Sequence, residues 1–176
     1  RTYLERHRLD TVVTEDLNAV LEELSGRSWD QFFDQWIYHG GYPELEANYS
    51  WDETQKLAKV SLTQRQPISD RVLLFRLPLT LRFKSPQTTL DQPVVLSRVT
   101  EEFQVSLPAA PQIVRIDPEL AVLAKVRIHL PLPMIHAQLA DPDDVIGRLR
   151  AVDVLGEHKD RDSVGRLQRV LNEDAF

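Results

Sequence analysis

Histidine is the side chain most often used in metal and acid–base sites, and this chain has five of them: His7, His39, His129, His136 and His158. None lies in an H-E-x-x-H arrangement, in which two imidazoles one helical turn apart reach a single zinc ion. His129 and His136 are close in sequence, but Pro131 and Pro133 lie between them and break any shared helix. We therefore predict no metal site among the histidines.

The other reactive residue types are not arranged for catalysis either. The chain has no G-x-S-x-G turn, no glycine-rich phosphate loop and no cysteine, which excludes a thiol nucleophile and a thiolate zinc site. Acidic pairs such as Glu101-Glu102 are adjacent, so their side chains diverge, whereas paired carboxylate catalysis needs converging groups. The triplet Asp160-Arg161-Asp162 lacks the glycine and distal glutamate of a calcium-binding loop. We predict no catalytic residue and no metal-binding residue in this sequence.

Composition places the chain among globular proteins and narrows its partners. It has 176 residues, of which 42% are hydrophobic and 27% charged. A net charge of -6 argues against a broad nucleic-acid surface, and no apolar run reaches the roughly 18 residues of a membrane span. We expect neither nucleic acid nor a membrane as partner, and the compartment is unknown. Because Arg1 already lies in a helix-like pattern, we expect the sequence to be part of a longer chain.

Residues 1–42 have the apolar spacing of helices. One stripe is Leu17, Val20, Leu21 and Leu24, and Gly26 follows as a helix stop. A second predicted helix has a bulky stripe of Trp29, Phe32, Phe33, Trp36 and Ile37, before Gly40-Gly41-Tyr42-Pro43 breaks the chain. So few helices cannot bury so many aromatic rings by themselves. We predict that the following residues pack between domains: Trp29, Phe33, Trp36, Gly41, Tyr42 and Pro43.

Residues 43–131 have the period of two that is typical of half-buried strands. Seven short strands are predicted, at 45–51, 58–62, 75–83, 94–96, 103–107, 113–116 and 125–130, with a hairpin turn at 52–55. Pro78 favours an edge position or a bulge for the third strand. This pattern predicts an antiparallel β-sandwich.

Residues 132–176 return to helical spacing. Asp141-Pro142-Asp143-Asp144 predicts a helix start, Leu155-Gly156 its end, and Asp160 or Asp162 the start of a second helix. The expected inner face of this pair is Ile146, Leu149, Val152, Val164, Leu167 and Leu171. The pattern, which runs on to Asp174, resembles a HEAT-type helical hairpin. The predicted fold class is therefore multi-region α+β, with N-terminal helices, an antiparallel β-sandwich and a C-terminal HEAT-like hairpin.

Several segments resemble the aminopeptidase N family of gluzincin zinc metallopeptidases. They are Tyr3-Leu4-Glu5-Arg6-His7, Thr14-Glu15-Asp16-Leu17, and Trp36 followed by Gly41-Tyr42-Pro43, as at the end of that family's catalytic domain. The strand residues Leu45-Glu46-Ala47 and Tyr49-Ser50-Trp51, then Asp117-Pro118, 125–130 and the helices from Leu132, follow in the family's order. The resemblance covers essentially the whole chain.

The resemblance implies a division into three domains and a function for the parent protein. Residues 1–42 would be the helical tail of a thermolysin-like catalytic domain, 43–131 a β-sandwich domain, and 132–176 the first HEAT-like helices. The partners implied are an upstream catalytic domain and downstream helical repeats of the same chain. The parent would bind Zn²⁺ and remove N-terminal residues from peptides. The family's zinc ligands and catalytic tyrosine lie upstream of Arg1, so Tyr3 is not that tyrosine.

Two other functions stay open at this stage. One is a non-enzymatic interaction scaffold, similar to the TATA-binding-protein-associated factor that shares this layout without zinc ligands. An H-E-x-x-H motif with a second glutamate upstream would distinguish a peptidase from such a scaffold. The other is an independent sugar-binding sandwich, which is less favoured because no aromatic platform stands out in residues 43–131.

Overall fold

The computed structural model describes residues 1–158 and 160–173, and it divides the chain into two compact units. Unit 1 comprises residues 1–41 and 67–73. Unit 2 comprises residues 42–66 and the described residues from 74 onward. The end of the predicted hairpin, including Asp174, lies outside the described residues. In the part of the chain described, no helix is both long and apolar enough to cross a membrane.

Unit 1 is built from short helices. They are α1 (Thr2–Arg6), α2 (Thr14–Ser25), α3 (Asp30–Phe33) and a π-helical turn, η1 (Asp34–Tyr38). Gly26 ends α2 in the left-handed conformation, with φ +67° and its N–H 2.8 Å from the Glu22 carbonyl oxygen, as predicted.

The prediction of a second helix in this region is wrong in one respect, because the segment is not α-helical throughout. The π turn beginning at Asp34 changes the angle between successive side chains, so positions after it leave the face that the α-helical spacing predicted. Phe33 is buried as expected, but the next buried side chain is Gln35, and Phe32 and Ile37 of the stripe are exposed.

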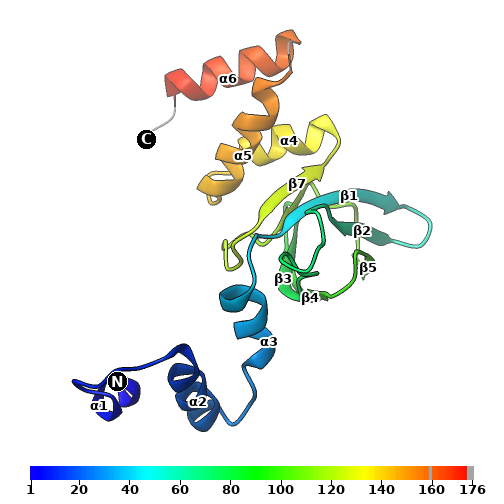
Figure 1. Cartoon of the computed structure of the whole chain (residues 1–176). Coiled ribbons are helices and arrows are strands. Elements are labelled where there is room, and N and C mark those ends of the chain that lie inside the picture. Colours follow the sequence, from blue (N-terminus) through cyan, green and yellow to red (C-terminus); the bar gives the residue numbers. More distant parts are fainter. Residues whose placement is uncertain (159, 174–176) are drawn as a thin grey trace. The chain divides into compact units, whose positions relative to one another are not determined.

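Unit 2 begins with two β-sheets (Figure 1). All seven predicted strands are present. The four-stranded sheet has the order β5-β2-β1-β7 and contains β1 (Glu44–Asp52), β2 (Leu57–Gln64), β5 (Thr100–Ser106) and β7 (Lys125–His129). The three-stranded sheet has the order β4-β3-β6 and contains β3 (Leu77–Lys84), β4 (Thr89–Leu96) and β6 (Ile113–Ile116). The structure confirms the α+β class and the two sheets. One strand pair departs from the antiparallel prediction, because β7 runs parallel to β1.

The inner faces of the strands form the core of unit 2. Along β2 and β3, alternate side chains are buried, as the period of two requires. The least exposed of these residues are Ala58, Val60, Leu62, Leu77 and Leu81, each 0% exposed. The same alternation made the strands recognisable in the sequence.

The prediction that Pro78 belongs to an edge strand is wrong, since β3 is the middle strand of its sheet. The reason is the length of β6, which pairs only with residues 81–84 of β3. At Pro78, β3 has a neighbour on one side alone, where Val95 of β4 lies opposite. The missing proline N–H therefore costs no ladder hydrogen bond.

Three helices complete unit 2: α4 (Leu132–Leu139), α5 (Val145–Gly156) and α6 (Arg161–Glu173). Ile135 and Leu139 of α4 pack with Ala151 and Leu155 of α5 in a small buried cluster. Leu167 and Val170 of α6 lie partly buried against it.

The predicted inner face of the last two helices is largely wrong. The buried side of α5 is Gly147, Ala151 and Leu155, four residues apart, whereas Leu149 and Val152 are exposed. Val164 and Leu171 of α6 are exposed as well. The prediction considered α5 and α6 alone, but α4 packs on α5 and determines which side of α5 is buried.

Candidate functional site

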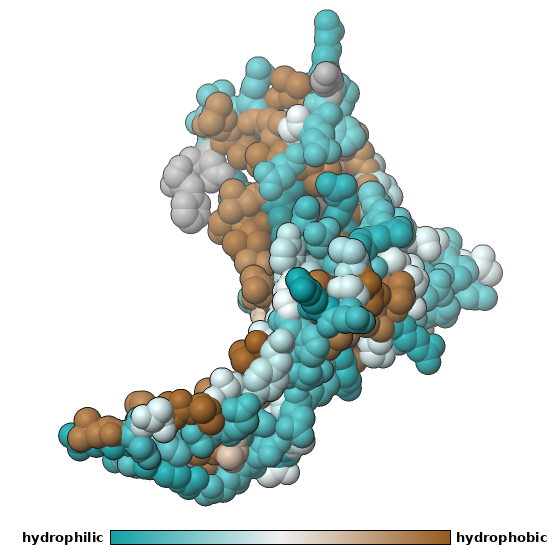
Figure 2. All heavy atoms as spheres, viewed as in Figure 1, coloured by the Kyte–Doolittle hydropathy of each residue, from teal (hydrophilic) through white to brown (hydrophobic). Residues whose placement is uncertain are grey.

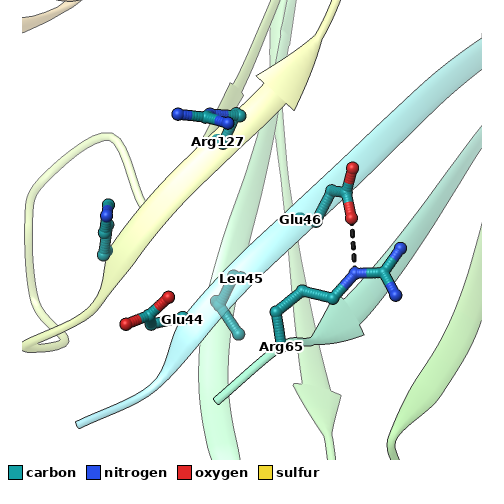
Figure 3. A pocket seen from close by; sticks show the side chains of 6 residues that line it. Glu44, Leu45, Glu46, Arg65 and Arg127 are labelled. Carbon is teal, nitrogen blue, oxygen red and sulfur yellow. Dashed lines mark hydrogen bonds and ion pairs between the residues drawn. The ribbon is translucent and has the colours of Figure 1, made fainter.

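A shallow hollow of about 180 Å³ lies on the four-stranded sheet, where β1, β7 and the residue after β2 meet (Figure 3). It is lined by Glu44, Leu45, Glu46, Arg65, Lys125 and Arg127. Five of these six side chains are charged. Neither the hollow nor its residues were predicted from the sequence, because β1 and β7 are far apart along the chain.

The parallel register of β1 and β7 brings these charges together. In the register of the two strands, Lys125 lies beside Glu44 and Arg127 lies beside Glu46. Because alternate residues of a strand point to the same side, Lys125, Arg127 and His129 share the solvent face of β7. The residues between them, Val126 and Ile128, are half-buried.

Glu46 is the best-connected side chain of the hollow. Its carboxylate accepts a hydrogen bond from the Arg65 guanidinium (Figure 3). Its Oε1 also lies 3.0 Å from Nε2 of His129. The bond from Arg65, and then that from His129, holds the pKa of Glu46 below its ordinary value. A carboxylate with a lowered pKa is a poor proton acceptor near neutral pH, so this geometry does not make Glu46 a general base.

Two cations of the hollow have no ion-pair partner among the residues that the structure describes. Although Glu46 lies in register with Arg127, its carboxylate is engaged by Arg65 and His129. Among residues 1–158 and 160–173, neither Lys125 nor Arg127 has an ion-pair partner. The arrangement can attract an anionic group.

The described residues do not fit a metal ion. Within residues 1–158 and 160–173, no group of three or more His, Cys, Asp or Glu side chains could hold one. His129 lies on β7 beside Glu46, and His136 lies on α4 with its Nδ1 3.5 Å from Asp162. The two histidines are thus on separate elements with separate partners.

The predicted interdomain aromatic residues occupy different environments within unit 1. The indole N–H of Trp29 donates to Ser25 Oγ at 2.9 Å, and the guanidinium of Arg27 lies 4.2 Å from the centre of its ring. Phe33 is buried, and Trp36 is half-buried. Their contact with another domain stays a prediction.

Gly41 has a clear structural role inside unit 1. Its φ is +83°, and an added Cβ would lie 2.8 Å from a methyl group of Val72. The N–H of the neighbouring Gly40 donates to the carbonyl of Arg71 at 2.9 Å. The two glycines therefore let the chain run close to residues 67–73, a contact that the sequence did not reveal.

Tyr42 and Pro43 belong to unit 2 and differ in burial. Tyr42 is 47% exposed, whereas Pro43 is fully buried and its carbonyl accepts the N–H of Lys125 at 2.9 Å. Pro43 thus fixes where the pairing of β1 with β7 begins. Its predicted interdomain role is likewise untested.

A buried ion pair, which was not predicted from the sequence, joins the three-stranded sheet to α5. Arg115 of β6 is 3% exposed, and its Nε lies 2.7 Å from Oδ2 of Asp144. Burial lowers the pKa of Arg115, and Asp144 opposes that shift. Asp144 also accepts the N–H of Gly147 at 2.7 Å, which caps α5. The signal was an arginine within the otherwise apolar strand Ile113–Ile116.

The predicted helix start at Asp141 is therefore displaced to Asp144. Asp141 instead binds Lys84 of β3, with Nζ and Oδ1 2.6 Å apart. The hydrogen bond that Lys84 donates to Asp141 is the largest cause of a raised pKa of Lys84. The acidic segment that reads as a helix start thus joins helix and sheet.

Comparison with known proteins identifies the class of fold but not a family. No family model and no curated protein matches this chain. Solved structures do match, and one of them, an aminopeptidase, has a similar fold over part of its length.

One of the matching structures is aminopeptidase A of Legionella pneumophila, solved in complex with aspartic acid. The TM-score is 0.74 at 12% sequence identity, and the match covers 99% of this chain. The chain spans only 22% of the length of that structure. At this identity the likeness concerns the fold alone.

Proposed function

We propose that this chain is a non-catalytic C-terminal fragment of a zinc-dependent aminopeptidase. In this role it supports the catalytic domain and shapes the access of peptides, whose N-terminal residues the parent enzyme removes. The observation that carries the proposal is the fold similarity, which covers nearly all of this chain but about a fifth of a solved aminopeptidase.

The exposed surface of unit 1 supports a partner of this kind. Helix α1 has no buried residue, and α2 has only Val20. Figure 2 shows hydrophobic residues on the visible surface of these helices. Large side chains that are at least half exposed in unit 1 are Leu4, Leu9, Val13, Leu24, Ile37 and Tyr38. A catalytic domain packed on them would remove this apolar area from water.

The zinc of the proposed enzyme would be held outside this chain. The described residues offer no converging set of ligands, and three protein ligands are usual for a catalytic zinc. No step of peptide hydrolysis is therefore assigned to a residue of this sequence.

The test uses the full-length parent protein. Its upstream sequence should contain H-E-x-x-H and a second glutamate, and the purified protein should hydrolyse aminoacyl amides, lose this activity to a chelator and regain it with zinc. A parent without these ligands and without activity would favour the non-enzymatic scaffold instead.

A second experiment addresses the supporting role. In the full-length protein, Leu24→Asp should lower the melting temperature of the catalytic domain, because it places a charge on the proposed contact. Val95→Asp on β4 is the matched control, since Val95 is also partly exposed and lies in unit 2. Equal effects of the two substitutions would contradict the role.

A further inference from the structure

We propose that the open edge of β7 binds an acidic peptide segment in an extended conformation, which adds as a further strand to the four-stranded sheet. The inference is independent of the proposed function. It rests on the position of β7 in the sheet and on the charge of its solvent face.

The backbone of β7 supplies half of the site. β7 is the last strand in the order β5-β2-β1-β7, and it pairs with β1 on one side. The N–H of Lys125 points towards β1, because it donates to the carbonyl of Pro43. Backbone groups alternate along a strand, so the N–H and C=O groups of Val126 and Ile128 point to the opposite edge. Within the described residues, no strand pairs with that edge.

The side chains of β7 supply the other half. Lys125 and Arg127 are exposed, lie on one face and have no ion-pair partner among the described residues. Edge strands of natural proteins often have charged residues that prevent unwanted pairing. Two cations at alternate positions oppose a neutral or basic strand, but they attract one with carboxylates at the same spacing.

The chemistry of the partner follows from these two halves. Its backbone would pair with Val126 and Ile128, and acidic side chains at alternate positions would face Lys125 and Arg127. Arg65 adds a third positive charge in the same hollow, although Glu46 already engages it. The intervening residues of the peptide would lie on the face of Val126 and Ile128, which favours apolar side chains there.

The test is a titration of the 176-residue protein with a labelled hexapeptide of alternating valine and glutamate, at low salt. We expect saturable binding that weakens as salt increases, and shifted amide resonances at Val126 and Ile128. The double substitution Lys125→Glu and Arg127→Glu should weaken binding at least about tenfold. Arg169→Glu changes one exposed charge on α6 and should leave the affinity unchanged.

Three further probes separate strand addition from simple charge attraction. A valine–lysine hexapeptide should not bind, and a valine–glutamate peptide with alternate N-methylated amides should bind much more weakly, because it cannot pair with the edge. Equal binding of either peptide would overturn the proposal. Equal or tighter binding of a single-stranded oligonucleotide of the same charge would also overturn it, since that outcome would assign the surface to polyanions in general.

Discussion

Different kinds of interaction stabilise the interior of each of the two units. Unit 2 has a core of fully buried aliphatic side chains along its strands, such as Leu62 and Leu81. Unit 1 buries few hydrophobic side chains, among them Val20 and Phe33, and has polar contacts at its surface. Arg6 donates two hydrogen bonds to Glu23 at 2.8 and 3.0 Å, and the Tyr38 hydroxyl donates to Glu15 at 2.8 Å.

This difference predicts which unit is the more stable one by itself. Exposed ion pairs add little to stability, because water screens them and the long side chains lose freedom. Burial of apolar surface is the main stabilising contribution to folding. We therefore expect unit 2 to be more stable by itself than unit 1, whose leucines and aromatic rings are largely exposed to water.

The largest difference between the two units is expected when one leucine is truncated in each of them. Leu81→Ala removes a side chain that is 0% exposed and should destabilise unit 2 by about 4 kcal/mol. Leu24→Ala removes one that is 63% exposed and should change unit 1 by less than about 0.5 kcal/mol. Amide hydrogen exchange measured separately for each unit would detect both effects. A large loss of protection from Leu24→Ala in the chain alone would contradict the exposed surface of unit 1.

The next effect concerns the ion pair of Arg115 and Asp144. Asp144→Ala should destabilise unit 2 by about 3 kcal/mol, because it leaves the buried arginine uncompensated and removes the cap of α5. Asp143→Ala is the matched control in the same loop, where the side chain is 84% exposed. Denaturant unfolding followed by circular dichroism measures both. Substituting Arg115→Met in the Asp144→Ala background should recover part of the loss.

Glycine substitutions should have opposite signs in the two units. Gly41→Ala should destabilise unit 1 by about 2 kcal/mol, since φ is +83° and the new methyl group would overlap Val72. Gly165→Ala in α6 should stabilise that helix by about 0.5–1 kcal/mol, because the added methyl group meets open space. Hydrogen exchange of residues 67–73 and of α6 would report the two changes. A stabilising effect of Gly41→Ala would be inconsistent with the close approach of Val72.

The smallest expected effect is a pH dependence at Glu46 in unit 2. The folded pKa of Glu46 lies below the ordinary value of a glutamate, so its contacts stabilise the fold above that ordinary pKa. The contribution is lost as the pH falls through the lower, folded pKa. Glu46→Gln should therefore melt below the wild type near neutral pH, and the difference should vanish at strongly acidic pH. Arg65→Gln should reduce the same difference, because Arg65 is the main cause of the shift.

The strands of unit 2 could be predicted because their pattern is local. Alternating apolar residues, as in Leu77–Lys84, identify both the strand and its buried face without any knowledge of the neighbours. The hairpin turn was equally local, since Asp52 Oδ1 accepts the N–H groups of Thr54 and Gln55. The helix stop at Gly26 belongs to the same class.

The errors arose where a distant segment decides the outcome. The parallel pairing of β7 with β1, and with it the hollow around Glu46, depends on strand order. The buried face of α5 depends on α4, and the role of Asp141 depends on Lys84 of β3. Nothing near these residues in the sequence signals such contacts. The arginine of β6 is the exception, because a charge in a buried strand requires a partner.

The parallel pair of β1 and β7 also determines how the sheet would respond to tension. The chain enters β1 at its first residue, Glu44, and leaves β7 at its last, His129, before α4. Tension between the two flanking segments would pull the strands past each other along their length. All hydrogen bonds between residues 44–48 and 125–129 would then carry the load at once, rather than opening one by one. The pair would act as a mechanical clamp, and unit 2 would resist stretching until the whole register slips.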